Sequence, residues 1–108
     1  MANITQREVF IMEYRRFGNT IYLRLDPKEE ILEEIGKVAK KENIRLAQVT
    51  GLGAINDFTA GVYNTVTKEY HSIQFQGAFE IVSLTGTVTR KDGDVYLHLH
   101  IAAGDEEG

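Results

Sequence analysis

The clearest structural signal lies in residues 79–101, which read FEIVSLTGTVTRKDGDVYLHLHI. β-branched, aromatic and aliphatic residues dominate on both sides of residues 91–94, and such residues favour extended strands. The pair Asp92-Gly93 tolerates the positive φ angles that a tight hairpin turn requires. We therefore predict two antiparallel strands, 79–90 and 95–103, joined by a turn.

The same composition and punctuation predict further strands on the N-terminal side of this hairpin, over residues 8–15, 20–25, 44–50, 57–63 and 68–75. Residues 51–54, Gly-Leu-Gly-Ala, are interpreted as a tight turn between two of them, and Gly77 as a break before the strand from residue 79. The Gly-x-Gly motif at residues 51–53 lacks the third glycine and the following helix that a dinucleotide-binding loop needs.

One helix is predicted over about residues 27–42. Asp26 supplies an N-cap oxygen, Pro27 suits the first helical position, and Glu29 can reach back to the cap. Apolar residues then recur at intervals of three and four, which gives one apolar stripe: Ile31, Leu32, Ile35, Val38 and Ala39. The acidic residues that precede three lysines are interpreted as a solvated face, and Asn43 as the terminator. One helix and about seven strands indicate an α+β fold with a central, mainly antiparallel sheet.

Composition narrows the classes of function. A length of 108 residues suits one domain, 1–108, and the absence of cysteine excludes disulfides and thiolate ligands. We find neither a basic leader followed by an apolar run nor a segment long enough to span a bilayer, so we expect a cytoplasmic protein. The net charge of −4 works against direct DNA binding, because lysine and arginine supply the affinity for phosphates.

The chemically suggestive feature is a histidine pair in the last strand. Side chains alternate along a strand, so His98 and His100 share one face while their leucine and isoleucine neighbours share the other. Two imidazoles on one face suit a divalent ion such as zinc, although a catalytic zinc typically takes three protein ligands. The spacing alone leaves metal binding and an ordinary polar strand face equally open.

No third ligand is evident from spacing. His71, the remaining histidine, is interpreted as an ordinary strand residue, whereas the acids of residues 105–107 or a second subunit could complete a site. Glu80, between Phe79 and Ile81, is a candidate for moving protons; the alternative is an ordinary residue at an exposed or edge position.

Four short sequence motifs occur in order over residues 21–27, 50–54, 77–86 and 97–100. Through these motifs and their order, the chain resembles the PPC domain, named for plants and prokaryotes conserved. The resemblance implies an α+β domain that assembles as a homotrimer. In plants such domains accompany AT-hooks, short Arg-Gly-Arg segments that enter the minor groove, and mediate contacts with nuclear proteins. No Arg-Gly-Arg occurs here. We therefore expect a transcription-related binding module that associates with DNA only indirectly, by binding DNA-binding proteins.

The resemblance also implies that His98 and His100 hold a divalent metal, zinc being favoured, with a third histidine from a later Gly-Gly-His word. The Gly-Gly-His motif does not occur before Gly108, so we expect either a truncated chain or a third ligand that has been lost or replaced. The alternative function is a zinc enzyme acting on a small carbonyl or carboxylate substrate, because the fold also resembles that of acetolactate decarboxylase.

Overall fold

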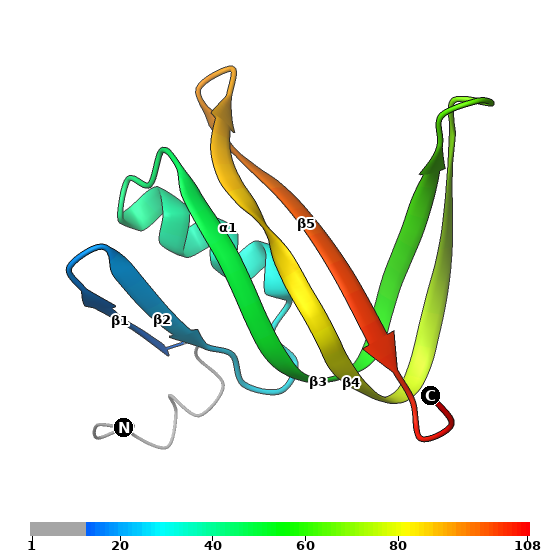
Figure 1. The fold of residues 1–108 in the computed structure, drawn as a ribbon. Helices are drawn as coiled ribbons and strands as arrows, with labels where there is room; N and C mark the ends of the chain where they lie inside the picture. The colour runs from blue at the N-terminus through cyan, green and yellow to red at the C-terminus, as the bar shows by residue number, and fades with distance from the viewer. Residues whose placement is uncertain (1–12) are drawn as a thin grey trace. The chain divides into compact units, whose positions relative to one another are not determined.

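The computed structural model describes residues 13–108, which form five strands and one helix (Figure 1). In chain order these are β1 (Glu13–Phe17), β2 (Thr20–Arg24), α1 (Ile31–Lys41), β3 (Ala47–Asn64), β4 (Glu69–Lys91) and β5 (Asp94–Gly104). β1 and β2 form one antiparallel sheet, and a second sheet has the order β3-β4-β5. The α+β prediction is confirmed. The predicted residues 8–12 of the first strand lie outside the described part.

The prediction of about seven strands is wrong, because glycines bend strands here without ending them. β3 continues without a break across residues 51–54. Its register with β4 shifts between Gly51 and Gly53 and again between Ile55 and Asp57. Gly53 and Gly77 take φ angles of 142° and 131°. Such conformations are open to glycine and let a strand bulge while its pairing resumes. Two pairs of predicted strands are therefore single long strands.

The helix starts four residues later than predicted. Lys28 has a φ of 76°, which is incompatible with a continuous right-handed helix from Pro27. The predicted reach-back contact still forms, since Glu29 Oε1 accepts a hydrogen bond from the Asp26 backbone N–H at 2.6 Å, but it closes a turn instead. Glu30 is the actual N-cap, and its carboxylate accepts from the N–H of Glu33.

The C-terminal end of the helix is as predicted. Asn43 is left-handed with a φ of 53°, and the N–H of Ile44 donates back to the carbonyl of Ala39 at 2.8 Å. The side chain of Arg90, in β4, donates to the carbonyl of Ile44 at 3.0 Å. Asp92 and Gly93 also take positive φ angles, so the hairpin turn between β4 and β5 is confirmed.

The described residues group into two compact units. The helix unit comprises residues 13–45 and 89–97, and the arm unit comprises residues 46–88 and 98–108. Val38 and Ala39 are the buried apolar residues of the helix unit, and Val88 is that of the arm unit. None of the described helices is long and apolar enough to cross a membrane.

The charged face of α1 is not wholly solvated, which corrects the sequence interpretation. Glu34 is buried, and Lys37 Nζ lies 3.0 Å from its Oε2. The same ammonium donates a hydrogen bond to Glu34 Oε1 at 3.5 Å, whereas Oε2 has no hydrogen-bond donor among the described residues. This hydrogen bond, and then the charge of Glu34, raise the pKa of Lys37, and the pair compensates part of the cost of burying a carboxylate.

A second polar cluster joins β1 to the end of α1. Tyr14 donates its hydroxyl to Glu42 Oε2 at 2.9 Å, and Arg16 donates to Glu42 Oε1 at 3.0 Å. The bonds from Arg16 and then Tyr14 hold the pKa of Glu42 below its ordinary value, and the pKa of Tyr14 is raised in turn.

Candidate metal centre

Strand β5 presents two different faces. Leu97, Leu99 and Ile101 are half-buried, whereas His98 and His100 are exposed. This is the alternation expected of a strand with one packed face. The sheet thus places both imidazoles on its open face, where a ligand from solvent can reach them.

The two imidazoles converge. Nε2 of His98 lies 3.1 Å from Nε2 of His100, and the ring centroids are 5.0 Å apart. Two nitrogens bound to one tetrahedral zinc at about 2.05 Å would lie about 3.3 Å apart. A hydrogen bond between neutral imidazoles would also account for the observed distance. The pair is therefore close to the spacing that a shared ion requires.

Gly86 determines how closely β4 approaches β5 beneath this pair. A Cβ at position 86 would lie 2.8 Å from Leu99 Cα, 2.6 Å from the Leu99 side chain and closer still to the carbonyl oxygen of His98. Only glycine fits such an approach. The backbone that carries the histidines is thus fixed by a glycine on the neighbouring strand.

The other predicted candidates lie apart from the pair or show no special environment. His71 is exposed on β4, with Nε2 3.5 Å from Glu69 Oε2. Asp105 closes a turn with the N–H of Glu107. Glu80 is exposed and lies opposite Ala54, on β4, the central strand of its sheet. Within residues 13–108, no cluster of three or more His, Cys, Asp or Glu side chains is arranged to hold a metal.

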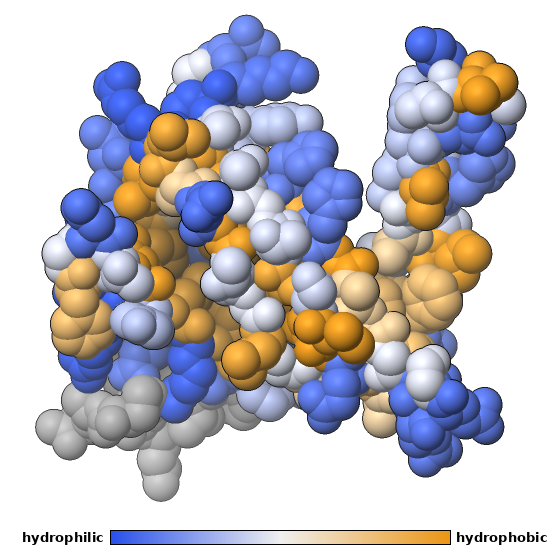
Figure 2. Space-filling model, in the orientation of Figure 1, coloured by the Kyte–Doolittle hydropathy of each residue, from blue (hydrophilic) through white to orange (hydrophobic). Residues whose placement is uncertain are grey.

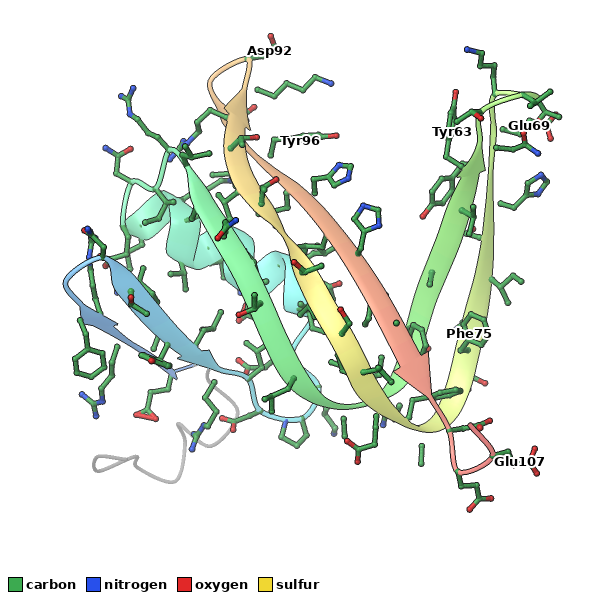
Figure 3. The ribbon with its side chains drawn as sticks, in the orientation of Figure 1. Tyr63, Glu69, Phe75, Asp92, Tyr96 and Glu107 are labelled. Carbon is green, nitrogen blue, oxygen red and sulfur yellow. The ribbon has the colours of Figure 1, made fainter. Side chains whose placement is uncertain are left out.

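The strands predicted over residues 57–63 and 68–75 pair with each other as a long two-stranded arm, residues 57–64 with 69–76. Sequence reasoning missed that each of them continues, without a break, into the rest of β3 or β4. Figure 3 shows Tyr63 and Glu69 near the tip of the arm and Phe75 towards its base. At the base, the rings of Phe58, Phe75 and Phe79 pack with centroids 5.2 to 6.1 Å apart.

The arm has one apolar and one polar face. Cross-strand partners share a face, so Ala60 with Ile73 and Val62 with His71 extend the phenylalanine cluster outward, while Thr59 with Gln74 lies on the other side. Val62 is 73% exposed and Ile73 is 62% exposed. Figure 2 shows hydrophobic surface along the arm, interrupted by polar residues. A two-stranded ribbon with an uncovered apolar face is marginally stable in water by itself.

Comparisons with known proteins agree with this fold. Residues 12–108 match the family described as the Plants and Prokaryotes Conserved (PCC) domain. The comparison with curated proteins gave no match.

Solved structures superpose closely. A candidate DNA-binding protein from Bacteroides thetaiotaomicron is 31% identical over 89% of this chain and 67% of its own, with a TM-score of 0.85. A plant- and prokaryote-conserved (PPC) protein from Pyrococcus horikoshii is 34% identical over 91% of this chain and 66% of its own, with a TM-score of 0.75.

A metal-containing protein from Archaeoglobus fulgidus, 22% identical over 91% of this chain and 63% of its own with a TM-score of 0.71, shares the fold. The chain spans about two thirds of the length of each of these three proteins. The family match over residues 12–108 and the two relatives above 30% identity lead to one conclusion: the chain belongs to the Plants and Prokaryotes Conserved domain family, the PPC domain.

Proposed function

We propose that this chain is a zinc-binding, self-associating module that works in a DNA-associated setting through partner proteins. The observation that carries the metal assignment is the 3.1 Å separation of the two Nε2 atoms on an exposed strand face. Neutral imidazole is the commonest metal ligand in proteins, and zinc accepts it readily. Two protein ligands would leave coordination positions for water, a carboxylate or a partner's side chain.

Metal content tests this assignment. Protein purified without an affinity tag is expected to hold about one zinc per chain by elemental analysis. His98→Ala and His100→Ala should each lose it, because a single exposed imidazole holds zinc weakly. His71→Ala is the matched control and should keep its zinc. Unchanged zinc content in both strand β5 variants would refute the site.

Self-association, as a homotrimer, is supported by the uncovered apolar face of the arm. Val62 and Ile73 expose hydrocarbon that a second copy would remove from water, at about 25 cal/mol for each Å². A homotrimer requires a head-to-tail contact, in which different surfaces of neighbouring copies meet and the rotation between copies closes a ring.

Light scattering with paired variants tests the assembly. Ile73→Glu places a charge on the apolar face and should shift the wild-type trimer towards monomer. Thr59→Glu places the same charge on the polar face of the same arm and should leave the mass unchanged. A wild-type chain that is monomeric at micromolar concentration would contradict the proposal.

The indirect relation to DNA is supported by charge and by relatives. A net charge of −4 repels the phosphate backbone, whereas a relative 31% identical is a candidate DNA-binding protein. A mixed-sequence duplex should show no anisotropy change with the isolated chain at physiological salt. Binding with a steep dependence on salt would mean that the chain contacts DNA itself.

A further inference from the structure

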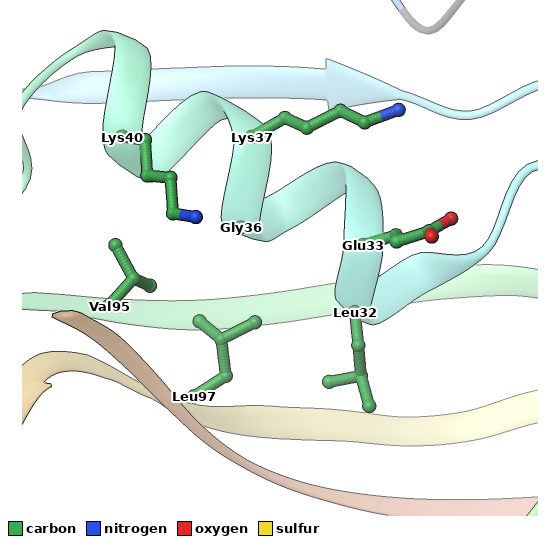
Figure 4. A pocket seen from close by; sticks show the side chains of 7 residues that line it. All are labelled: Leu32, Glu33, Gly36, Lys37, Lys40, Val95 and Leu97. Atoms are coloured by element: carbon green, nitrogen blue, oxygen red, sulfur yellow. The ribbon is translucent and has the colours of Figure 1, made fainter.

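A hollow lies in the helix unit, between α1 and the first residues of β5, and neither histidine of the metal pair lines it. The cavity measures about 300 Å³. Its floor is apolar: Val95 and Leu97 rise from β5 towards the helix, and Leu32 descends from the helix towards the strand (Figure 4). Leu32 is 48% exposed although it belongs to the apolar stripe of the helix.

Gly36 forms the roof of this hollow, in the interior of α1. A Cβ placed on it would meet no atom within 4 Å. Glycine costs a helix interior about 1 kcal/mol relative to alanine, and no described side chain requires its absence of a Cβ. A glycine that faces open space lets another molecule approach the helix backbone closely.

The two lysines that line the hollow, Lys37 and Lys40, point in different directions. The side chain of Lys40 descends from the helix over Val95, whereas the side chain of Lys37 runs along the helix away from the strand (Figure 4). Lys37 is engaged by Glu34, and no ion pair of Lys40 occurs among the described residues. Glu33 lines the hollow near Leu32, about 10 Å along the helix from Lys40. The hollow therefore has a cationic end and an apolar middle.

We propose that this hollow binds an amphipathic carboxylate, with the carboxylate at the Lys40 ammonium and a short acyl chain lying over Gly36 against Leu32, Val95 and Leu97. The volume suits roughly ten water-sized groups, which is the size of a medium-chain acid such as octanoate. Electrostatic complementarity fixes the direction of the ligand, because Glu33 repels a carboxylate placed at the other end.

Octanoate titrated into the full chain, followed by ¹H–¹⁵N NMR, tests the proposal. Saturable shifts are expected at the amides of Gly36, Val95 and Leu97. Lys40→Gln should weaken binding about three- to tenfold, through loss of one charge-assisted contact. The matched control is Lys41→Gln, whose side chain lies over the ring of Tyr14 instead and whose substitution should leave affinity within about twofold.

Two substitutions of the same glycine separate occupancy of the hollow from effects on the helix. Gly36→Leu should fill the hollow and abolish the saturable shifts, while Gly36→Ala adds one methyl group and should retain them. Circular dichroism confirms that each variant is folded.

Three results would overturn the proposal: no saturable binding to wild type, equal affinity in Gly36→Leu, or equal affinity for neutral octan-1-ol and octanoate. None of them bears on the zinc assignment, which depends on a different face of β5.

Discussion

Two glycines of this chain should respond to the same substitution with opposite signs. Gly36→Ala adds a methyl group to the interior of α1, where its Cβ meets nothing within 4 Å. The helix then gains the difference in propensity between the two residues, about 1 kcal/mol. For a domain of this size, that free energy corresponds to a rise in the melting temperature of roughly 4–8 °C.

Gly86→Ala adds the same methyl group beneath β5. There the Cβ would lie 2.8 Å from Leu99 Cα, which is backbone and cannot rotate away. The strands must separate locally, or the β5 backbone must shift. Overpacking of this kind typically costs about 1–3 kcal/mol.

Urea unfolding followed by circular dichroism measures both effects. All three proteins are compared at one protein concentration, because self-association makes apparent stability depend on concentration. The expected order of unfolding free energies is Gly36→Ala above wild type and Gly86→Ala below it. A destabilised Gly36→Ala would mean that the roof of the hollow is occupied, and an unaffected Gly86→Ala would refute the close approach of β4 and β5.

Three further predictions concern stability. The pKa of Glu42 is held below its ordinary value of 4.5 by Arg16 and Tyr14, so its contribution is present above pH 4.5 and is lost as the pH falls through the lower, folded-state pKa. Urea unfolding should therefore separate Glu42→Gln from wild type at pH 7 and bring the two together at pH 3. Asn43→Ala should lose about 1 kcal/mol, because alanine resists a φ of 53°, and Asn43→Gly should lose less in the same assay. Val38→Ala removes two buried methyl groups and should cost about 2 kcal/mol.

Some turns and helix ends could be predicted because their conformation depends only on the residues within them. The hairpin turn requires positive φ angles at Asp92 and Gly93, and the end of the helix requires one at Asn43. All three residues have positive φ angles. The start of the helix could not be predicted in this way. Asp26, Pro27 and Glu29 satisfy every rule for a helix cap, but the left-handed Lys28 turns the chain first, and sequence offers no sign that a lysine will do so.

Glycine within strands was ambiguous for a physical reason. The positive φ of Gly53 or Gly77 suits a turn and a bulge equally well, and only the partner strand decides between them. Pairing between residues far apart in the chain kept β3 and β4 continuous. A prediction based on local breaks therefore divided each of these strands in two.

Part of the candidate site followed from periodicity. Alternation along β5 put His98 and His100 on one face, as predicted, and the exposed position of His71 agrees with its interpretation as an ordinary residue. The hollow at Gly36 did not follow, because sequence gives no account of where a helix faces empty space.

The rings of His98 and His100 lean towards each other, and this inclination of the two side chains needs a physical explanation. Neighbours on one face of a strand lie about 6.6 Å apart, yet the imidazole centroids are 5.0 Å apart and the Nε2 atoms 3.1 Å. A hydrogen bond between the rings keeps a proton on one Nε2, whereas a shared ion needs both Nε2 lone pairs and leaves each proton on Nδ1. Nitrogen-15 spectra should therefore show both Nε2 atoms deprotonated when zinc is added at neutral pH. Spectra of His98 and His100 that zinc leaves unchanged would make the hydrogen bond the whole explanation of the lean and would remove the metal site.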